Sequence, residues 1–271
     1  MKNKYITRWI KLIRPIRAIW AIILLIIGIS APCPAEQKPV FGSVANIVPL
    51  SYNEDGVVKG LFSDIFLDAA QRAGLEVSLK LYPVKRLDTY LRSGKIDGVV
   101  TLIRTKEREK YLTYFTSPIV ISRTLVFVKK GREFPFTSVN DLMEKKIGIL
   151  IGWKTENKAF EQHIKNGTIQ NEQVIDQNQN LKKLMKDRID CFIGTELLTL
   201  YRANMLGLAE HIVFLETPIA EHRVFSAISK HAKNIADPQT FIKKMDAALD
   251  EIQSDGTYDK LWKRYKVTTL K

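Results

Sequence analysis

Helix-like and strand-like patterns of hydrophobic residues alternate along the chain from residue 40 onward. Apolar side chains recur at every third or fourth position over residues 61–73, which predicts a helix that ends at Gly74. Over residues 75–81 they alternate with polar ones, which predicts a half-buried strand. Similar patterns predict further strands at residues 40–45, 96–103, 125–129, 147–151 and 189–193, and helices at residues 87–91, 105–111, 139–143, 154–165, 181–185 and 196–205. This alternation is typical of an α/β fold.

The C-terminal residues predict two more helices. Asp237 followed by Pro238 is typical of a helix start, because an aspartate caps free backbone N–H groups and proline fits the first helical position. Apolar residues then share one face of a long helix. Gly256 interrupts this pattern, and residues 258–265 predict the last helix.

Residues 91–100 and 184–193 are similar to each other. Each stretch reads as the end of a helix, a polar turn, the dipeptide Ile-Asp and a buried strand. Two α/β lobes of similar construction would produce this sequence similarity, and chance could also produce it in any α/β protein. The sequence leaves both interpretations open.

The first 35 residues have the order of a secretory signal peptide. Six Lys and Arg residues precede residue 18 with no acid among them, an unbroken apolar run occupies residues 18–29, and small residues lead to Ala35. We therefore expect cleavage after Ala35 and a periplasmic protein. One alternative is an uncleaved membrane anchor, but the apolar run is shorter than the roughly 20 residues that cross a membrane. The other is a lipoprotein with its lipid on Cys33, but Pro32 replaces the small residue that lipid attachment requires before the cysteine.

The composition agrees with an exported globular protein. The 271 residues are 45% hydrophobic and 26% charged, which argues against disorder and against a multispan membrane protein. Loss of six of the 42 basic residues with the signal peptide leaves 36 against 29 acids, so the net charge falls from +13 to +7. The remaining basic residues are spread along the chain, and we expect no nucleic-acid partner. Without Cys33, Cys191 has no partner for an intramolecular disulfide.

Motifs for cofactor, metal or nucleophile chemistry are missing from the sequence. It contains no phosphate-binding glycine loop, no dinucleotide-binding loop and no nucleophile elbow. Its four histidines show no metal-ligand spacing, and the one cysteine that remains after loss of the signal peptide cannot build a zinc site. We therefore expect neither a cofactor nor a metal.

Short motifs in a fixed order give the chain a resemblance to a known family. They cover almost all of residues 38–266: PLSY at 49–52, GLFSD at 60–64, RSGKID at 92–97, TKER at 105–108, FTSP at 115–118, IGILIG at 147–152, RID at 188–190 and GTYDKLW at 256–262. With this ordered set the chain resembles the bacterial extracellular solute-binding proteins of family 3. That family supplies amino acids and other small polar solutes to ABC importers.

The resemblance implies a type 2 periplasmic binding protein fold, in which two hinge strands join two α/β lobes and the ligand binds in the cleft between them. Lobe 1 would comprise residues 36–127 plus 219–271, and lobe 2 residues 128–218. The implied function is the capture of a small polar solute with a carboxylate, an amino acid or related anion, by a monomer that serves an ABC transporter permease in the inner membrane. The alternatives are a periplasmic enzyme similar to cyclohexadienyl dehydratase and the sensing partner of a membrane receptor.

Arg108 is the principal candidate ligand-binding residue. By the resemblance it matches the arginine that holds a ligand carboxylate through a bidentate guanidinium, and Thr101 matches a hydroxyl that assists it. Tyr52 matches an aromatic wall of the cleft, and Arg86 could point into it. Without the resemblance, Arg108 reads as a solvated residue paired with a neighbouring glutamate, Tyr52 as a core tyrosine and Arg86 as a surface residue.

Gly152, Trp153, Lys154 and Thr155 lie between a predicted strand and a predicted helix. Free N–H groups at a helix start suit an anion, Trp153 could stack on a ligand, and Lys154 could add charge. The same residues also fit an ordinary strand-to-helix turn that is capped by Thr155.

Thr195 and Glu196 depart from the family pattern. Amino-acid-binding members of the family usually place an aspartate for the α-ammonium group where this chain has Thr195, and a hydroxyl cannot supply that charge. Glu196 is the one nearby carboxyl group that the enzyme alternative could use as an acid. Because Arg86, Arg108 and Lys154 are cations, the expected site favours an anionic solute, or an amino acid that is held differently.

Overall fold

The computed structural model describes residues 37–153 and 157–267. Contacts group residues 38–271 into one compact unit and the preceding residues into another, and only the first of these is described below. The expected signal peptide lies outside the described residues, as do Lys154 and Thr155. Within the described residues, no helix combines the length and the hydropathy that a membrane crossing requires.

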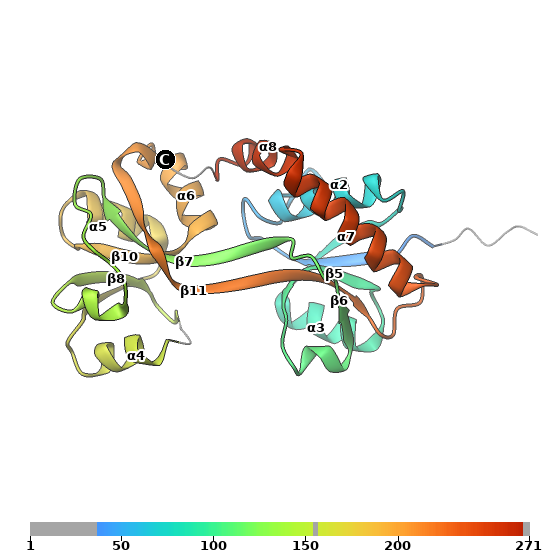
Figure 1. The fold of residues 1–271 in the computed structure, drawn as a ribbon, viewed down its shortest axis with the longest axis horizontal. Coiled ribbons are helices and arrows are strands. Elements are labelled where there is room, and N and C mark those ends of the chain that lie inside the picture. The colour runs from blue at the N-terminus through green and yellow to red at the C-terminus, as the bar shows by residue number, and fades with distance from the viewer. Residues whose placement is uncertain (1–36, 154–156, 268–271) are drawn as a thin grey trace, which may run out of the picture. The chain divides into compact units, whose positions relative to one another are not determined.

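A single mixed sheet organises the described residues and confirms the α/β expectation (Figure 1). Its strands follow the order β4-β1-β5-β11-β7-β10-β8-β9, and β6 pairs with β11. The bounds are β1 Val40–Val44, β4 Ser78–Tyr82, β5 Gly98–Ile103, β6 Leu112–Tyr114, β7 Val120–Lys129, β8 Lys146–Leu150, β9 Gln170–Val174, β10 Cys191–Thr195 and β11 Ile212–Ser229. A separate hairpin pairs β2 Tyr52–Glu54 with β3 Val57–Lys59.

Helices connect the parallel strands and complete the C-terminal part. Their bounds are α2 Leu61–Arg72, α3 Val84–Ser93, α4 Lys158–Lys165, α5 Gln177–Met185, α6 Glu196–Met205, α7 Pro238–Ser254 and α8 Thr257–Arg264, with short 3-10 helices η1 Arg108–Lys110, η2 Val139–Leu142 and η3 Ala209–His211. The expected start of α7 is confirmed, because the Asp237 carboxylate accepts hydrogen bonds from the N–H groups of Gln239 and Thr240.

Some predicted elements shift or were missed, and the causes are local. The strand predicted from residue 75 begins at Ser78, because the N–H of Leu75 still donates to the Ala70 carbonyl at the end of α2. The helix start expected at residues 105–111 is the 3-10 turn η1. Strand β9 reads QNEQV and so lacks the apolar alternation that would have revealed it.

The two halves of the sheet repeat one topology. The series β1-α2-β4-α3-β5 gives the strand order β4-β1-β5, and β8-α4-β9-α5-β10 gives β9-β8-β10. Both series pair their strands in parallel. We call the first series, together with α7 and α8, the first half, and the second series, together with α6, the second half. The similar stretches at residues 91–100 and 184–193 occupy equivalent positions in this repeat.

An aspartate fixes the strand register in each half. The N–H of Asp97 donates to the Val40 carbonyl at 2.9 Å, and the N–H of Val40 donates to Oδ2 of Asp97 at 2.8 Å. Asp190 and Lys146 form the same two bonds in the second half, at 2.9 and 2.7 Å. The dipeptide Ile-Asp therefore recurs because the same pairing of parallel strands recurs.

Strands β7 and β11 connect the two halves and run side by side (Figure 1). In the second half β7 pairs with β10, and in the first half β11 pairs with β5. The register between β7 and β11 shifts between Leu215 and Ala220, which interrupts an otherwise continuous ladder. This irregularity lies between the parts of β11 that pair in the two halves.

Asp97 gives the first testable prediction. Its carboxylate is 2% exposed and accepts hydrogen bonds from the N–H groups of Val40, Lys233 and Asn234 and from the Asn234 side chain, at 2.8 to 3.0 Å. Burial alone would raise the pKa of Asp97, but these bonds outweigh it and hold the pKa below its usual value. We expect Asp97→Asn to lower the free energy of unfolding at pH 7 by about 2–4 kcal/mol, because the amide directs a donor at other donors.

The pH dependence and a matched variant check this prediction. Because the folded pKa lies below the unfolded value of about 3.9, the stabilisation by Asp97 is present above that pH and is lost as the pH falls below it. Urea unfolding should therefore show a difference between wild type and Asp97→Asn at pH 7 that shrinks toward pH 3. Asp190→Asn, at an exposed carboxylate, should cost less than about 1 kcal/mol. Equal losses for the two variants would contradict the assignment.

Candidate functional site

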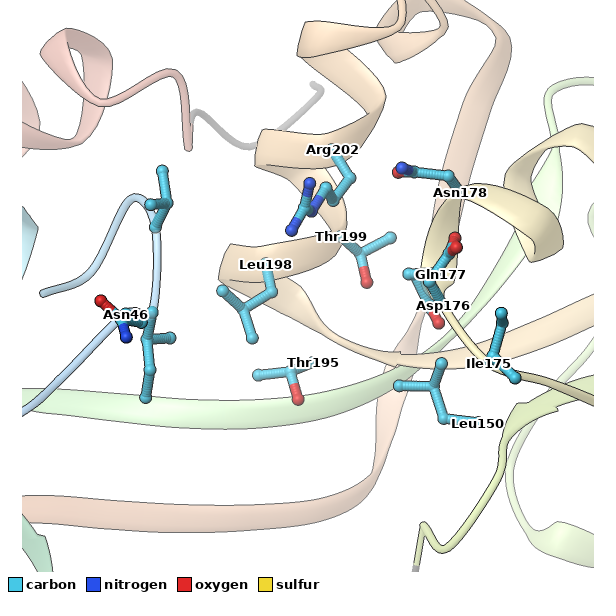
Figure 2. Close-up of a pocket in the computed structure, with 12 residues that line it drawn as sticks. Asn46, Leu150, Ile175, Asp176, Gln177, Asn178, Thr195, Leu198, Thr199 and Arg202 are labelled. Atoms are coloured by element: carbon cyan, nitrogen blue, oxygen red, sulfur yellow. The ribbon is translucent and has the colours of Figure 1, made fainter. Parts of the chain in front are cut away.

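The carboxyl ends of parallel strands from both halves surround one pocket of about 460 Å³ (Figure 2). We call it the strand-end pocket. The first half contributes the loop after β1. The second half contributes the ends of β8 and β10, the loop after β9, the start of α5 and one face of α6. The lining residues are Asn46, Ile47, Val48, Leu150, Ile175, Asp176, Gln177, Asn178, Thr195, Leu198, Thr199 and Arg202.

Strand register explains why these second-half residues converge. Leu150 at the end of β8 lies opposite Val174, so the residues after Val174 emerge beside it. Because Gly148 of β8 lies opposite Phe192 of β10, the end of β10 at Thr195 reaches the same edge. Open α/β sheets bind ligands in this position, outside the carboxyl ends of their strands.

One face of α6 forms a wall of the pocket. Four lining residues are spaced three, one and three positions apart, which places them on the same side of the helix: Thr195, Leu198, Thr199 and Arg202. Figure 2 shows these four residues along α6 and at its start. The wall therefore presents two hydroxyls, one apolar side chain and one guanidinium.

Gly194 allows α5 and α6 to approach β10 closely. A Cβ atom on Gly194 would lie 2.3 Å from Oγ1 of Thr199 and 2.4 Å from Nε2 of Gln177, closer than any side chain permits. That Nε2 group donates to the Ile193 carbonyl at 3.2 Å, which holds Gln177 against the strand. Thr199 and Gln177 consequently border the pocket together.

Arg108 and Thr101 lie at the carboxyl end of β5 and in the segment after this strand. Thr101 is a buried residue of β5, 8% exposed. Arg108 is half-buried in η1, and its Nη1 group donates to the Ile103 carbonyl at 2.9 Å. Strand β5 pairs with β1, whose following loop lines the strand-end pocket, although neither Thr101 nor Arg108 is among the lining residues.

Tyr52 and Arg86 are not among the residues that line the strand-end pocket. Tyr52 belongs to the β2–β3 hairpin and packs half-buried against the core of the first half. Burial, and then the neighbouring Glu54, raise the pKa of Tyr52. Arg86 is exposed on α3. The structure therefore does not bring these two predicted residues to the pocket.

Gly152 and Trp153 follow β8 in a turn. Gly152 is exposed with a φ of 76°, and the Trp153 N–H donates to the Leu150 carbonyl at 3.0 Å. The ring of Trp153 meets that of Phe160 edge-on, with 5.7 Å between the ring centres, and packs against the core of the second half. Neither residue lines the strand-end pocket.

Thr195 and Glu196 are adjacent in sequence but face different cavities. Thr195 lines the strand-end pocket, whereas Glu196 borders a second cavity of about 450 Å³ beside β7, α7 and α8. The Glu196 carboxylate accepts two hydrogen bonds from the Arg123 guanidinium, at 2.6 and 2.8 Å. The side chain of Glu196 is only 3% exposed, so this bidentate ion pair occupies its carboxylate.

Five polar or charged residues line the pocket although the sequence did not predict them there: Asn46, Gln177, Asn178, Thr199 and Arg202. Arg202 carries the one signal that could have revealed it, because it follows Thr195 by seven residues, about two helical turns. The others come from α6, from the loop after β1 and from the first turn of α5, which follows β9. Since β9 is polar and was not recognised as a strand, its loop could not be placed at a strand end.

Metal and thiol chemistry find no support among the described residues. No group of three or more His, Cys, Asp or Glu side chains in this part of the chain could hold a metal ion. Cys191 is buried in β10, and burial raises the pKa of its thiol to about 12. The thiol therefore stays protonated and unreactive at neutral pH.

Comparison with known proteins places this geometry in a family. Residues 40–268 match the model of the bacterial extracellular solute-binding proteins, family 3. The chain is 27% identical to the probable histidine-binding protein of Campylobacter jejuni, over 83% of this chain and 84% of that protein. It is 25% identical to the L-cystine-binding protein TcyJ of Escherichia coli K12, over 80% and 78% of the two chains.

Solved structures support the same fold. The second substrate-binding domain of GlnP from Lactococcus lactis, in its open conformation, superposes with a TM-score of 0.67. The match covers 86% of this chain and 98% of that domain at 19% identity, so it concerns the fold alone. The expected type 2 periplasmic binding protein fold is thereby confirmed.

The Arg123–Glu196 pair gives the second prediction. Removal of the cation by Arg123→Met should lower the free energy of unfolding by about 3–5 kcal/mol, because it leaves a buried carboxylate without its partner. The double variant Arg123→Met/Glu196→Met should recover most of that loss, because no buried charge remains. Urea unfolding of the two single variants and the double variant measures the coupling. Additive losses would show that the pair does not interact.

Proposed function

We propose that this protein binds a solute with a carboxylate and delivers it to an ABC transporter permease. The chain belongs to the bacterial extracellular solute-binding proteins of family 3, and it therefore captures a small solute. The histidine- and L-cystine-binding names of its relatives point to an amino acid or a related anion as the solute class. The sequence order of residues 1–35 adds export by a signal peptide that is cleaved after Ala35, and a periplasmic monomer.

The strand-end pocket is the observation that carries the proposal. It draws residues from the first half and from the second half, so a solute inside it contacts both. Its volume of about 460 Å³ suits a small molecule of amino-acid size, and its walls mix apolar side chains with a few polar groups. A shared pocket of this kind is what a protein that closes on its solute requires.

We assign Arg108 and Thr101 to the solute's carboxylate. The bond from Nη1 of Arg108 to the Ile103 carbonyl holds the guanidinium at the carboxyl end of β5, next to the strand whose loop lines the pocket. The other N–H groups of a guanidinium remain available for a bidentate contact with a carboxylate. The hydroxyl of Thr101 lies on the same strand.

Closure in this proposal is a hinge motion along β7 and β11, with the two halves as lobes divided near residues 127 and 218. The register shift between Leu215 and Ala220 supports this location, since an interrupted ladder resists bending less than a continuous one. The solute favours the closed arrangement only by making better contacts there. The permease then binds the closed form.

Release of the solute without chemical change is also part of the proposal. An enzyme on this scaffold would need a free carboxylic acid near the solute. Glu196 was the candidate acid, and its carboxylate is bound by Arg123 outside the strand-end pocket. Mass spectrometry of solute recovered after incubation should therefore detect the starting compound alone.

A thermal-shift screen tests the proposed function. The chain, purified from the periplasm of a bacterial host, is screened against amino acids, organic acids and amines. A carboxylate-bearing compound at 100 times its dissociation constant should stabilise the protein by about 2.7 kcal/mol and so raise the melting temperature. Arg108→Ala should abolish this shift, whereas Lys110→Ala, at an exposed neighbour in η1, should keep it. Preferential binding of an amine that lacks a carboxylate would refute the solute class.

A further inference from the structure

Arg202 is a cation of the strand-end pocket that forms no ion pair with a described acid. The guanidinium is exposed on the face of α6 that lines the pocket. Asp176 is the one acid among the lining residues, and it accepts a hydrogen bond from the N–H of Gln179 at 3.1 Å as the cap of α5. A positive charge of the second half therefore lines the pocket without an ion pair to a described carboxylate.

Buried polar atoms without partners stand beside this cation. Thr199 is 1% exposed, and its Oγ1 atom has no hydrogen-bond partner among the described residues. The Oδ1 atom of Asn178 is likewise buried and unpaired within the described chain. An unsatisfied buried polar group costs about 1–3 kcal/mol. Both residues line the pocket, where the Thr199 hydroxyl can donate to a carboxylate oxygen of a bound solute and Oδ1 of Asn178 can accept from a donor group.

The rest of the lining combines five apolar side chains with the polar residues Asn46, Gln177 and Thr195. The hydrophobic surface of the pocket comes from Ile47, Val48, Leu150, Ile175 and Leu198. Ile175 is 76% exposed and Val48 38% exposed, so both present hydrocarbon to whatever enters. A short carbon chain between two polar ends matches this arrangement.

We infer that the solute has two carboxylates and that Arg202, with the hydroxyl of Thr199, binds the second one from the second half. The inference rests on the proposed function, in which Arg108 binds the first carboxylate from the first half. A diacid neutralises both guanidinium groups when the halves close, whereas a solute with one carboxylate leaves one cation unpaired. The substrate class is therefore a small dicarboxylate whose two acid groups are joined by a short carbon chain.

Diacids and their half-amides test the inference, because each pair has almost the same shape and differs by one charge. The probes are glutarate, adipate and L-glutamate, compared by calorimetry with glutaramate, adipamate and L-glutamine. Wild-type protein should bind at least one diacid about tenfold or more tightly than its half-amide. Arg202→Gln should bind the diacid and the half-amide equally, because the group that distinguishes them is gone. Arg132→Gln, at an exposed arginine outside both pockets, should behave as wild type.

The possible results separate this inference from the proposed function. Unchanged affinity of the half-amide in Arg202→Gln shows that the variant is folded and that its loss is specific to the second carboxylate. Wild-type binding of a monocarboxylate in preference to every diacid, or discrimination that persists in Arg202→Gln, would overturn the inference and leave the proposed function intact. If no carboxylate of either panel binds wild-type protein, the proposed function fails and the inference fails with it.

Discussion

The register of the parallel strands is the constraint on which the rest of the structure depends. In each half an aspartate, Asp97 or Asp190, ties the last strand to the first residue of its parallel neighbour through one backbone bond and one side-chain bond. This pairing decides which loops emerge at the same edge of the sheet. The loops after β1 and β9 and the end of β10 can line one pocket only because these strands end level with the strands beside them.

The sequence predicted the elements that depend on hydrophobic periodicity and on local capping. The amphipathic helix α2, the alternating strand β4 and the capped start of α7 were all visible in this way. Polar β9 and the long β11 were not, because their pairing depends on partners distant in sequence. The sequence similarity around Asp97 and Asp190 could have arisen from a structural repeat or by chance. Both aspartates make the same pair of bonds, which favours the structural repeat.

The candidate site was less accessible to prediction than the fold. Thr195 was expected at the pocket and lines it, but its neighbour Glu196 turns to Arg123, a partner 73 residues away that no local pattern indicates. Arg202 was not predicted for a different reason, because a lone arginine on a helix reads as a solvated residue. Only the position of α6 beside the loop after β1 gives that charge a place in a pocket.

Backbone hydrogen–deuterium exchange with and without a bound carboxylate solute tests most directly the claim that one solute contacts both halves at the strand ends. The account predicts joint protection of residues 46–48, 175–178 and 195–202, which lie far apart in the sequence and surround the strand-end pocket. Protection confined to one half, or centred on the cavity beside β7, α7 and α8, would contradict it.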